Sequence, residues 1–356
     1  MATYPGFSTD RMDAIFAVES RVAAMVEVEA AVAAAQGAAG DIPEESAAAI
    51  VAACSEPIDT GILAQGWQVG TPVLPLLDEL KARLPDSART FVHHALTTQD
   101  VVDTATMCLA SSALDHLADL SSDAASALRT IITRFGGIAT EARSFLQPAD
   151  VTTVGFRAAR WLDQLDRARR RLASTETPVQ LGGLIGDRMS IADDVVDGVA
   201  ERLGLASRLP WHTDRGPIID IVHTVTDLAR WAGKVAVDIA QLVQLGEITT
   251  RAGGSSAAAG KRNPIDAMRA SAAAEACVGV SSVVLQSSPH ELERGLGRWH
   301  AEWFAVPLIF QTAGAAMEAA CAALGSLEVE PTSLVVPEAR RIAADAYVAA
   351  VLEQSS

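Results

Sequence analysis

The sequence predicts an all-α protein built from long helices. Hydrophobic residues make up 49 % of the 356-residue chain, and aromatic residues make up only 4 %. Much of the hydrophobic share is alanine, the strongest helix former, and β-branched residues are not concentrated in short alternating runs. A chain of this length can bury a sizeable core and form two or three domains. We therefore expect helix nearly throughout.

The first hundred residues predict a small group of helices. Apolar residues recur at helical spacing over residues 10–40, and the stretch from Gly40 to Pro43 ends that pattern. We interpret this pattern as a first helical hairpin. Further helices around 44–54 and 74–83 would complete an N-terminal domain that ends near the segment FVHHALTTQD.

The middle of the chain carries two apolar stripes with coiled-coil spacing. The longer stripe predicts a helix from about 217 to 245, roughly 40 Å long at 1.5 Å per residue. Its members are Ile221, Val225, Leu228, Ala232, Val235, Ile239 and Leu242. The second stripe consists of Ala158, Leu162, Leu165, Ala168 and Leu172. Such stripes are covered by other long helices, so an oligomerising bundle is the natural architecture and a monomeric bundle is the alternative.

Charge and cysteine usage exclude several classes of function. The formal net charge of -16 would repel a phosphate backbone, so nucleic acid is not an expected partner. The densest basic cluster interrupts a helical pattern and is interpreted as a solvated helix face. It consists of Arg167, Arg169, Arg170 and Arg171. The four cysteines lack zinc-site spacing, so we expect reduced thiols and a cytoplasmic location. These are Cys54, Cys108, Cys277 and Cys321.

Two further signals are missing from the sequence. The N-terminus lacks a basic region followed by an apolar core, and no later segment gives about 18 uncharged apolar residues in a row. We therefore expect neither secretion nor membrane insertion. After Leu324 the chain has room for one more helix.

The first of three polar segments runs from His93 to Asp103. Thr97 and Asp100 have the spacing of a capping box, which would place Thr98 and Gln99 at a helix N-terminus. Free N–H groups there attract anions such as a carboxylate ligand. The alternative is that Thr97 only caps a helix and the histidines lie on the surface.

The second segment, residues 253–266, contains glycine, serine and alanine followed by Lys261-Arg262-Asn263-Pro264. Asn263 is predicted as a helix N-cap with Pro264 at the first helical position, so the preceding stretch is predicted to be a mobile loop. The loop offers hydroxyls beside two cations. A flexible linker is the alternative, although a linker has no use for such a charged end.

The third segment begins at His290 and continues to Trp303. Arg294, Arg298 and Glu302 are spaced to share one face of a helix. An ordinary salt-bridged helix would explain this spacing equally well.

Taken together, the three segments resemble, in order and approximate spacing, the conserved regions of the fumarase/aspartase superfamily. The second is similar to the loop GSSxMPxKxNP, with Gly254, Ser255, Ser256, Lys261, Asn263 and Pro264 retained. The first resembles HxGxTSQDVxDT, and ELERGLGRWHAEW resembles the third region of the cycloisomerase branch. Arg143-Ser144-Phe145-Leu146-Gln147 and Val179-Gln180-Leu181-Gly182-Gly183 add two further matching segments.

This resemblance implies an architecture and a reaction. It implies a homotetramer with a twenty-helix core and active sites assembled from three subunits. The domains would be 1–96, a central long-helix bundle over 97–328, and a short, truncated C-terminal segment over 329–356. The implied reaction is lactonisation of 3-carboxy-cis,cis-muconate in protocatechuate breakdown, the β-ketoadipate pathway. The implied partner is a small polycarboxylate substrate, with no membrane, metal or organic cofactor.

The resemblance also implies roles for individual residues. Ser255, Lys261 and His93 would be catalytic, with Ser255 handling the α-proton and being activated by Lys261, backbone N–H groups and loop closure. The substrate-binding residues would be Thr97, Thr98, Gln99, Arg143, Gln180, Ser256, Asn263 and Arg294.

Two departures from the superfamily patterns bear on the reaction. Phe145 replaces a histidine of the water- and amine-eliminating lyases, which favours the cycloisomerases because lactonisation has no separate leaving group to protonate. Ala257-Ala258-Ala259-Gly260 replaces a loop stretch that usually holds methionine and proline. The alternatives are therefore another lyase of the superfamily, with adenylosuccinate-, fumarate- or aspartate-type elimination, or a non-catalytic homologue.

Overall fold

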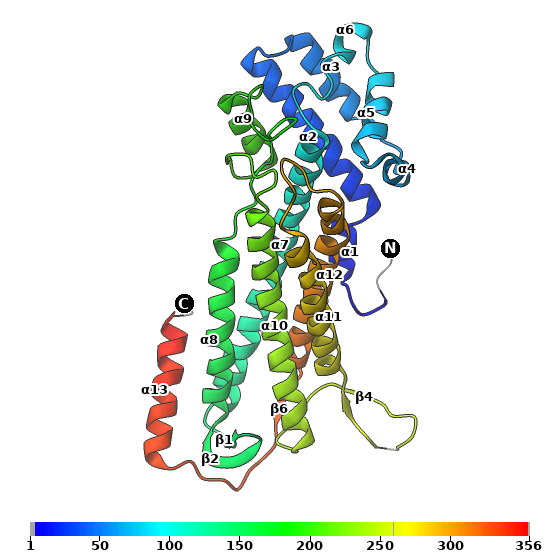
Figure 1. The fold of residues 1–356 in the computed structure, drawn as a ribbon. Coiled ribbons are helices and arrows are strands. Elements are labelled where there is room, and N and C mark those ends of the chain that lie inside the picture. The colour runs from blue at the N-terminus through cyan, green and yellow to red at the C-terminus, as the bar shows by residue number, and fades with distance from the viewer. Residues whose placement is uncertain (1–3, 259, 355–356) are drawn as a thin grey trace.

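The computed structural model describes residues 4–258 and 260–354 and confirms the all-α prediction. The chain forms a long helical bundle with a smaller group of helices at one end (Figure 1). The helices are α1 Asp10–Ile15, α2 Val18–Ala39, α3 Glu44–Cys54, α4 Ile62–Val69, α5 Val73–Ala82, α6 Asp86–Arg89, α7 Thr98–Phe135, α8 Val154–Ala173, α9 Asp193–Leu203, α10 Gly216–Gln244, α11 Ile265–Ser287, α12 Arg298–Gly325 and α13 Glu338–Gln354.

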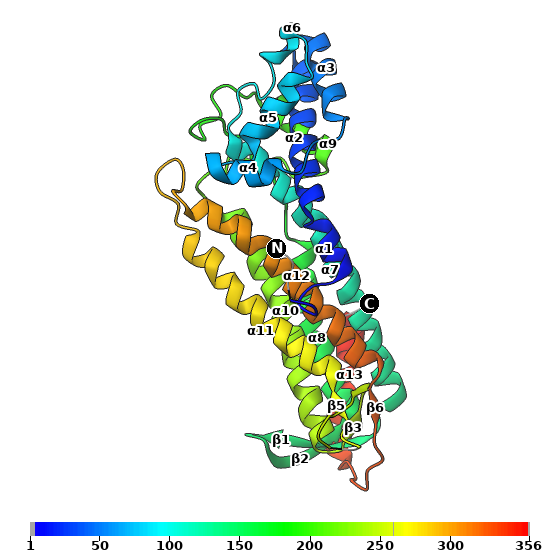
Figure 2. The ribbon, with the colours of Figure 1, turned by 90° about the vertical axis from the view of Figure 1, so that its right-hand side faces the viewer.

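The bundle is made of α7, α8, α10, α11 and α12, which lie side by side in Figures 1 and 2. The predicted helix over 217–245 is confirmed as α10, with Pro217 in its first turn. All seven residues of its apolar stripe are buried, with exposed fractions between 0 and 6 %. The second stripe is equally buried on α8. Both stripes therefore face the single large core of the bundle.

The N-terminal helices surround a second core. The predicted hairpin over residues 10–40 is wrong, because α1 and α2 follow each other in nearly one direction (Figure 2). The hairpin is instead formed by α2 and α3, and Gly40 makes the turn possible with a φ of 83°. Helix α9 packs on α2 in this core, although it lies within the stretch 97–328 expected to belong to the bundle.

Short strands were not anticipated and occur at the far end of the bundle (Figure 1). β1 (Ala139–Ser144) and β2 (Gln147–Thr153) form an antiparallel hairpin in which Ser144 pairs with Gln147. The two turn residues, Phe145 and Leu146, both have positive φ angles, of 51° and 62°. The other pairs are β3 (Ile248–Thr249) with β6 (Glu328–Val329), and β4 (Ala252–Gly253) with β5 (Asn263–Pro264).

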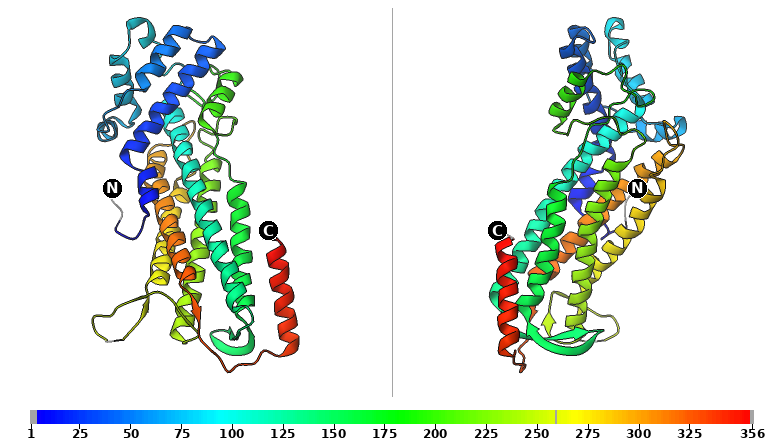
Figure 3. Two further views of the ribbon diagram at one scale, coloured as in Figure 1. Left: turned by 180° about the vertical axis from the view of Figure 1, so that it is seen from behind. Right: turned by 60° about the vertical axis from the view of Figure 1, so that its left-hand side comes forward.

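The helix expected after Leu324 is confirmed as α13, which packs along the outside of α8 (Figure 3). By length and composition alone, α2, α11 and α12 could each cross a membrane. In this fold, 61 % of the apolar window of α2 and 72 % of that of α12 are buried within the protein, against 33 % for α11. Packing in a helical protein therefore accounts for the apolar character of α2 and α12.

Two valines on α10 allow a matched test of this packing. Val235 is completely buried in the stripe, whereas Val237 is 47 % exposed. We expect Val235→Ala to lower the free energy of unfolding by about 2 kcal/mol or more, because two buried methyl groups are lost and a cavity remains. Val237→Ala should change it by less than about 0.5 kcal/mol. Urea unfolding followed by circular dichroism measures both, and equal losses would contradict the assignment of the stripe to the core.

Candidate functional site

The first polar segment folds into the N-terminus of α7 as predicted. Thr97 is the N-cap residue, and it forms the capping box with Asp100, whose Oδ2 accepts the Thr97 N–H at 2.9 Å. Asp100 is fully buried and also accepts N–H groups of Gly182 and Gly183 at 2.8 and 2.9 Å and Nε2 of Gln180 at 3.1 Å. One carboxylate thus joins the start of α7 to the chain segment 180–183.

Arg294 brings the third segment to the same place. Its guanidinium donates to the hydroxyl oxygen of Thr97 at 2.5 Å and to that of Thr98 at 3.4 Å. Burial lowers the pKa of Arg294 from its ordinary value, and no ion pair of Arg294 occurs within residues 4–258 and 260–354. A cation, two hydroxyls and a helix N-terminus therefore converge. No carboxylate among the described residues is ion-paired with the cation, although the negative charges of Asp100 and Asp103 act on it, and this arrangement suits an anionic ligand.

The placement of Arg294 corrects one expectation. Arg294, Arg298 and Glu302 do not share a helix face, because α12 begins only at Arg298. Arg294 lies in the preceding loop, which is held partly by the bond from Leu296 N–H to Glu291 Oε2 at 3.0 Å. The loop position is what lets the guanidinium reach back to Thr97.

His93 is oriented by a buried carboxylate. Its Nδ1 lies 2.6 Å from Glu29 Oε1 on α2, and its backbone has a φ of 62°. The Glu29 side chain is 2 % exposed and the His93 side chain 14 %. This pair fixes the ring through Nδ1 and leaves Nε2 as the ring nitrogen for a ligand.

The two glutamines expected to bind substrate are enclosed by protein groups. Gln99 donates through Nε2 to Asp103 and to the carbonyl of His212, at 3.0 and 2.6 Å. Gln180 accepts the Trp211 N–H at 2.7 Å and donates to Asp100. Both side chains are 0 % exposed. In this structure they position neighbouring groups, which differs from the expected direct contact with substrate.

Sequence reasoning missed His212, which lies beside this site. Its Nδ1 is 3.3 Å from Gln180 Nε2, and its Nε2 is shielded from solvent without a hydrogen-bond partner among the described residues. Burial, with the positive charge of Arg294 next in size, lowers the pKa of His212 to about 4. The imidazole is therefore neutral at physiological pH. Gly186 packs directly on the ring, where a Cβ would lie 2.9 Å from His212 Cβ.

A buried ion cluster centred on Arg215 was also missed. The Arg215 side chain is 0 % exposed and donates to Asp103 at 2.7 and 3.2 Å and to Glu302 at 2.6 and 3.1 Å. It lies 4.6 Å above the ring of Trp211. Burial alone would lower its pKa, but the two carboxylates outweigh burial and raise it. No local pattern signals this cluster, because Asp103 and Glu302 lie 112 and 87 positions away in the sequence.

The loop after β4 carries the predicted catalytic serine. Ser255 Oγ accepts the N–H groups of Ala257 and Ala258 at 3.3 and 3.2 Å, and Ser256 and Lys261 are exposed. The prediction that Asn263 caps a helix is wrong, because Asn263 lies in β5 and Pro264 is the residue before α11. Asn263 instead closes the loop by donating to the Gly254 carbonyl at 3.0 Å. Of the departing loop stretch, Ala259 lies outside the described residues.

The hairpin β1–β2 carries Arg143 and Phe145. Arg143 is ion-paired with Glu141 at 2.6 Å and with Glu247 at 2.5 Å. Phe145 is 98 % exposed at the hairpin tip. A positive φ strains the backbone of a bulky residue. Because the Phe145 side chain is almost fully exposed, packing within this chain explains neither that strained conformation nor the exposure of the ring.

These groups form two clusters at opposite ends of the bundle. Thr97, Thr98 and Arg294 lie near the N-terminal helices, whereas the Ser255 loop and the hairpin tip lie at the far end (Figures 1 and 2). Helix α7 alone spans 38 residues, about 57 Å. Within one chain the structure therefore brings the first and third segments together and leaves the second apart.

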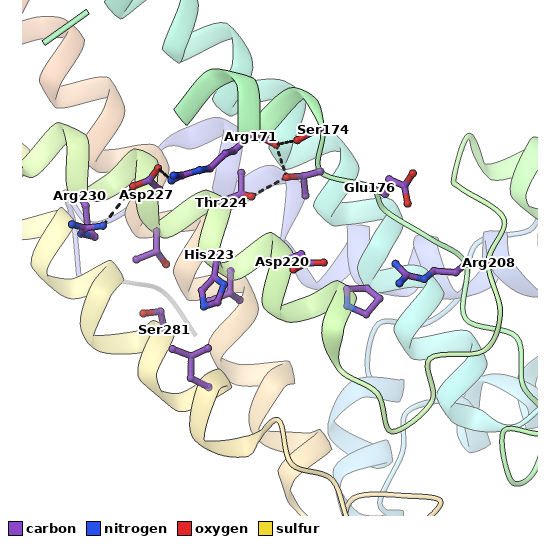
Figure 4. Close-up of a pocket in the computed structure, with 15 residues that line it drawn as sticks. Arg171, Ser174, Glu176, Arg208, Asp220, His223, Thr224, Asp227, Arg230 and Ser281 are labelled. Carbon is purple, nitrogen blue, oxygen red and sulfur yellow. Dashed lines mark hydrogen bonds and ion pairs between the residues drawn. The ribbon is translucent and has the colours of Figure 1, made fainter. Parts of the chain in front are cut away.

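A groove of about 620 Å³ between α8, α10 and α11 contains none of these residues. In Figure 4, Arg171 and Arg230 are both directed at Asp227. The hydroxyl oxygens of Thr175 and Thr224 lie 2.8 Å apart. Arg167 and Arg169 pair with Asp163 and Asp166 at 2.5 and 3.2 Å. Arg167 and Arg169 thus pair along their own helix and Arg171 pairs with Asp227 on α10, so these three cations of the basic cluster have acidic partners.

Possible metal ligands are dispersed in the part of the chain that the structure describes. No group of three or more His, Cys, Asp or Glu side chains there could hold a metal ion. Burial raises the pKa values of Cys54, Cys108 and Cys321 to about 12 and of Cys277 to about 11, so these thiols are protonated at neutral pH.

Comparison with known proteins identifies relatives over most of the chain. The family described as Lyase matches residues 6–279. Nitrosuccinate lyase of Streptomyces davaonensis is 36 % identical over 335 residues, covering 87 % of this chain and 70 % of that protein. The 3-carboxy-cis,cis-muconate cycloisomerase of Acinetobacter baylyi is 32 % identical, covering 90 % and 75 %. The crystal structure of 3-carboxy-cis,cis-muconate lactonizing enzyme from Pseudomonas putida superposes with a TM-score of 0.84 at 31 % identity, covering 91 % and 76 %.

The buried Asp100 predicts a pH dependence of stability. Burial raises its pKa to about 6, although four N–H donors oppose the shift. Between about pH 4 and 6 the folded chain keeps a proton that the unfolded chain has lost, so the contribution of Asp100 to the free energy of unfolding falls as pH rises, by the order of 3 kcal/mol. Urea unfolding of wild type and Asp100→Asn across this range should show wild type losing stability relative to the variant. Parallel curves would contradict the shift.

Proposed function

Because the chain belongs to the fumarase/aspartase superfamily of lyases, we propose that it is a 3-carboxy-cis,cis-muconate cycloisomerase. The observation that carries the proposal is the cluster of Thr97, Thr98 and Arg294, where a cation that forms no ion pair with the described part of the chain faces two hydroxyls at a helix N-terminus. A polycarboxylate substrate supplies the missing negative charge. The similarity to muconate cycloisomerases supports this substrate among polycarboxylates.

In the proposed reaction, a carboxylate oxygen of the substrate adds to a double bond of the same molecule. One C–O bond forms, and the electron pair of the double bond moves to the adjacent carbon, where the neighbouring carboxylate delocalises it. Ser255, or a group that it orients, then delivers one proton to that carbon. No atom leaves, so the reaction has no leaving group that the missing histidine at Phe145 would need to protonate.

The developing charge needs donors close to the substrate carboxylates. At one end of the bundle these would be Arg294, Thr97 and Thr98, with His93 held ready by Glu29. At the other end they would be Ser256, Lys261 and Asn263 beside Ser255. Gln99, Gln180 and Asp100 would hold the first group in place from behind.

We further propose that each active site is shared between chains of a cytoplasmic homotetramer. Two features support sharing: the separation of the two clusters along the bundle, and the exposed, strained Phe145 at the hairpin tip. Exposed apolar residues on the open face of α11 provide a surface for other long helices. They are Met268, Val278 and Leu285.

A second candidate is a lyase acting on nitrosuccinate, favoured by the 36 % identity to nitrosuccinate lyase. Both candidates use a carboxylate-bearing substrate, so the Arg294 cluster does not separate them. Consumption of nitrosuccinate, followed by proton NMR, would assign the chain to this second reaction if 3-carboxy-cis,cis-muconate is left unchanged.

The direct test follows the ultraviolet absorbance of 3-carboxy-cis,cis-muconate in buffer containing a metal chelator. We expect wild type to remove the diene absorbance and Ser255→Ala to be at least about 100-fold slower, because proton transfer is lost. Ser55→Ala, an exposed serine that follows α3 and lies outside both clusters and the open face of α11, is the matched control and should keep wild-type activity. Equal rates for wild type and Ser255→Ala would rule out the role of Ser255.

The sharing of sites is tested by mixing two inactive variants. Ser255→Ala and Arg294→Met damage clusters at opposite ends of one chain. If each site takes these residues from different chains, random reassembly of equal amounts restores both residues in about one quarter of the sites. Activity should recover to about that fraction after the variants are unfolded and refolded together. No recovery, with mixed oligomers demonstrated by mass spectrometry, would contradict sharing.

A further inference from the structure

The loop between α11 and α12 carries Arg294 and also buries a histidine that the proposed reaction does not use. This loop spans residues 288–297, at the end of the bundle that meets the N-terminal helices (Figure 2). The side chain of His290 is 0 % exposed. Two leucines of the same loop, Leu292 and Leu296, are 86 and 89 % exposed. The loop therefore turns apolar side chains outward and a polar ring inward, the reverse of what the hydrophobic effect favours.

The buried ring lies against the ion cluster of Arg215. His290 Nε2 is 3.2 Å from Glu302 Oε1 on α12. This contact is not aligned as a hydrogen bond, and neither ring nitrogen has a hydrogen-bond partner among the described residues. Asp103 and Glu302 share the guanidinium of Arg215, so these three residues carry two negative charges and one positive charge. An imidazole N–H beside Glu302 is attracted to that excess negative charge.

The ring also supports the backbone next to Arg294. Gly295 packs so closely on the imidazole that a Cβ there would lie 2.8 Å from His290 Cγ. Arg294 is the chain neighbour of Gly295, and its guanidinium reaches the hydroxyl oxygens of Thr97 and Thr98. The ring is thus held between a carboxylate of α12 and the backbone that carries the guanidinium.

The other side-chain contacts that shape this loop come from exposed groups. Glu291 accepts the Leu296 N–H at 3.0 Å, and Arg298 donates to the Pro289 carbonyl. The Glu291 and Arg298 side chains are 46 and 44 % exposed, so water competes for both contacts. His290 is therefore the attachment that water does not reach.

We propose that His290 is a positioning residue for Arg294. Its ring, attracted to Glu302, fixes the loop so that the guanidinium stands at the N-terminus of α7 before substrate arrives. The inference rests on the proposed function in taking Arg294 as a substrate-binding group. Without the ring the loop occupies other positions, and the apparent affinity for substrate falls with the fraction of chains that remain competent. Saturating substrate draws the loop back into place, so kcat is kept.

Two substitutions of His290 separate the ring nitrogen from the bulk of the side chain. They are assayed with whichever of the two candidate substrates the chain turns over. His290→Leu, which removes the N–H, should raise KM at least about tenfold and change kcat by less than about threefold. His290→Gln, whose amide can donate to Glu302, should keep KM within about threefold of wild type.

Gly295→Ala tests the second contact of the ring without removing the histidine. The added Cβ would meet the imidazole at 2.8 Å, so the loop must shift and KM should rise several-fold. Gly325→Ala, at the end of α12, is the matched control, because a Cβ there would meet no described atom within 4 Å. This control should keep the wild-type KM.

Hydrogen exchange followed by mass spectrometry reports on the loop without any substrate. Amides of residues 288–297 should exchange at least about tenfold faster in His290→Leu and in Gly295→Ala than in wild type, with the buried amides of α10 unchanged. If the chain turns over neither candidate substrate, the proposed function fails and this measurement alone decides the role of His290.

The proposal is overturned if His290→Leu leaves the exchange of the loop at the wild-type rate. It is also overturned if His290→Leu lowers kcat and leaves KM unchanged, since the ring would then act in the chemical step. A KM for His290→Gln as high as that of His290→Leu would exclude the contact with Glu302 as the cause. Circular dichroism checks folding, and Gly295→Ala decides by the same exchange criterion if His290→Leu does not fold.

Discussion

The buried ion cluster around Arg215 is the interaction on which the rest of this structure depends. A guanidinium removed from water is stable only when its charge and its N–H donors are matched, and Asp103 on α7 and Glu302 on α12 supply that match. Removing the guanidinium would leave two buried carboxylates without their shared cation, at a cost of about 3–5 kcal/mol. The cluster therefore fixes α7 and α12 in one relative position. Thr97 directly precedes α7 and Arg294 lies shortly before α12. Because the two helices are held in one relative position, the 2.5 Å contact between these residues is held as well.

Asp100, one turn before Asp103 on α7, is a second buried carboxylate that joins separate segments of the chain. Its carboxylate stabilises the positive end of α7 and at the same time binds the backbone of Gly182 and Gly183. The Asp100 carboxylate is already bound by four N–H donors. The groups that Arg294 contacts at this helix end are therefore the hydroxyls of Thr97 and Thr98. The polar side of the site thus rests on layers of buried charge, and its preorganisation comes from groups that never need to touch a ligand.

How far the sequence predicted this structure depends on the range of the interactions. The capping box at Thr97 and the seam on α10 were predicted correctly, because each is set by residues three to seven positions apart. The β1–β2 hairpin was missed, since its turn residues, Phe145 and Leu146, are not those that favour such a turn. Arg215 and His212 were missed because their partners come from distant segments, and a lone arginine or histidine has no local signature.

Asn263 and Arg294 show a different limit. Both were placed on helices from local rules that were sound in themselves, an Asn-Pro start and a four-residue charge spacing. In the structure each side chain instead makes a hydrogen bond to a residue farther away in the sequence, which local rules do not consider. Asn263 donates to the Gly254 carbonyl across its loop, and Arg294 donates to the Thr97 hydroxyl. Both residues are expected to bind substrate. A side chain that contacts a distant segment is more easily placed from a loop than from within a helix. Failure of the helical rules at these two positions is therefore what a functional loop would produce.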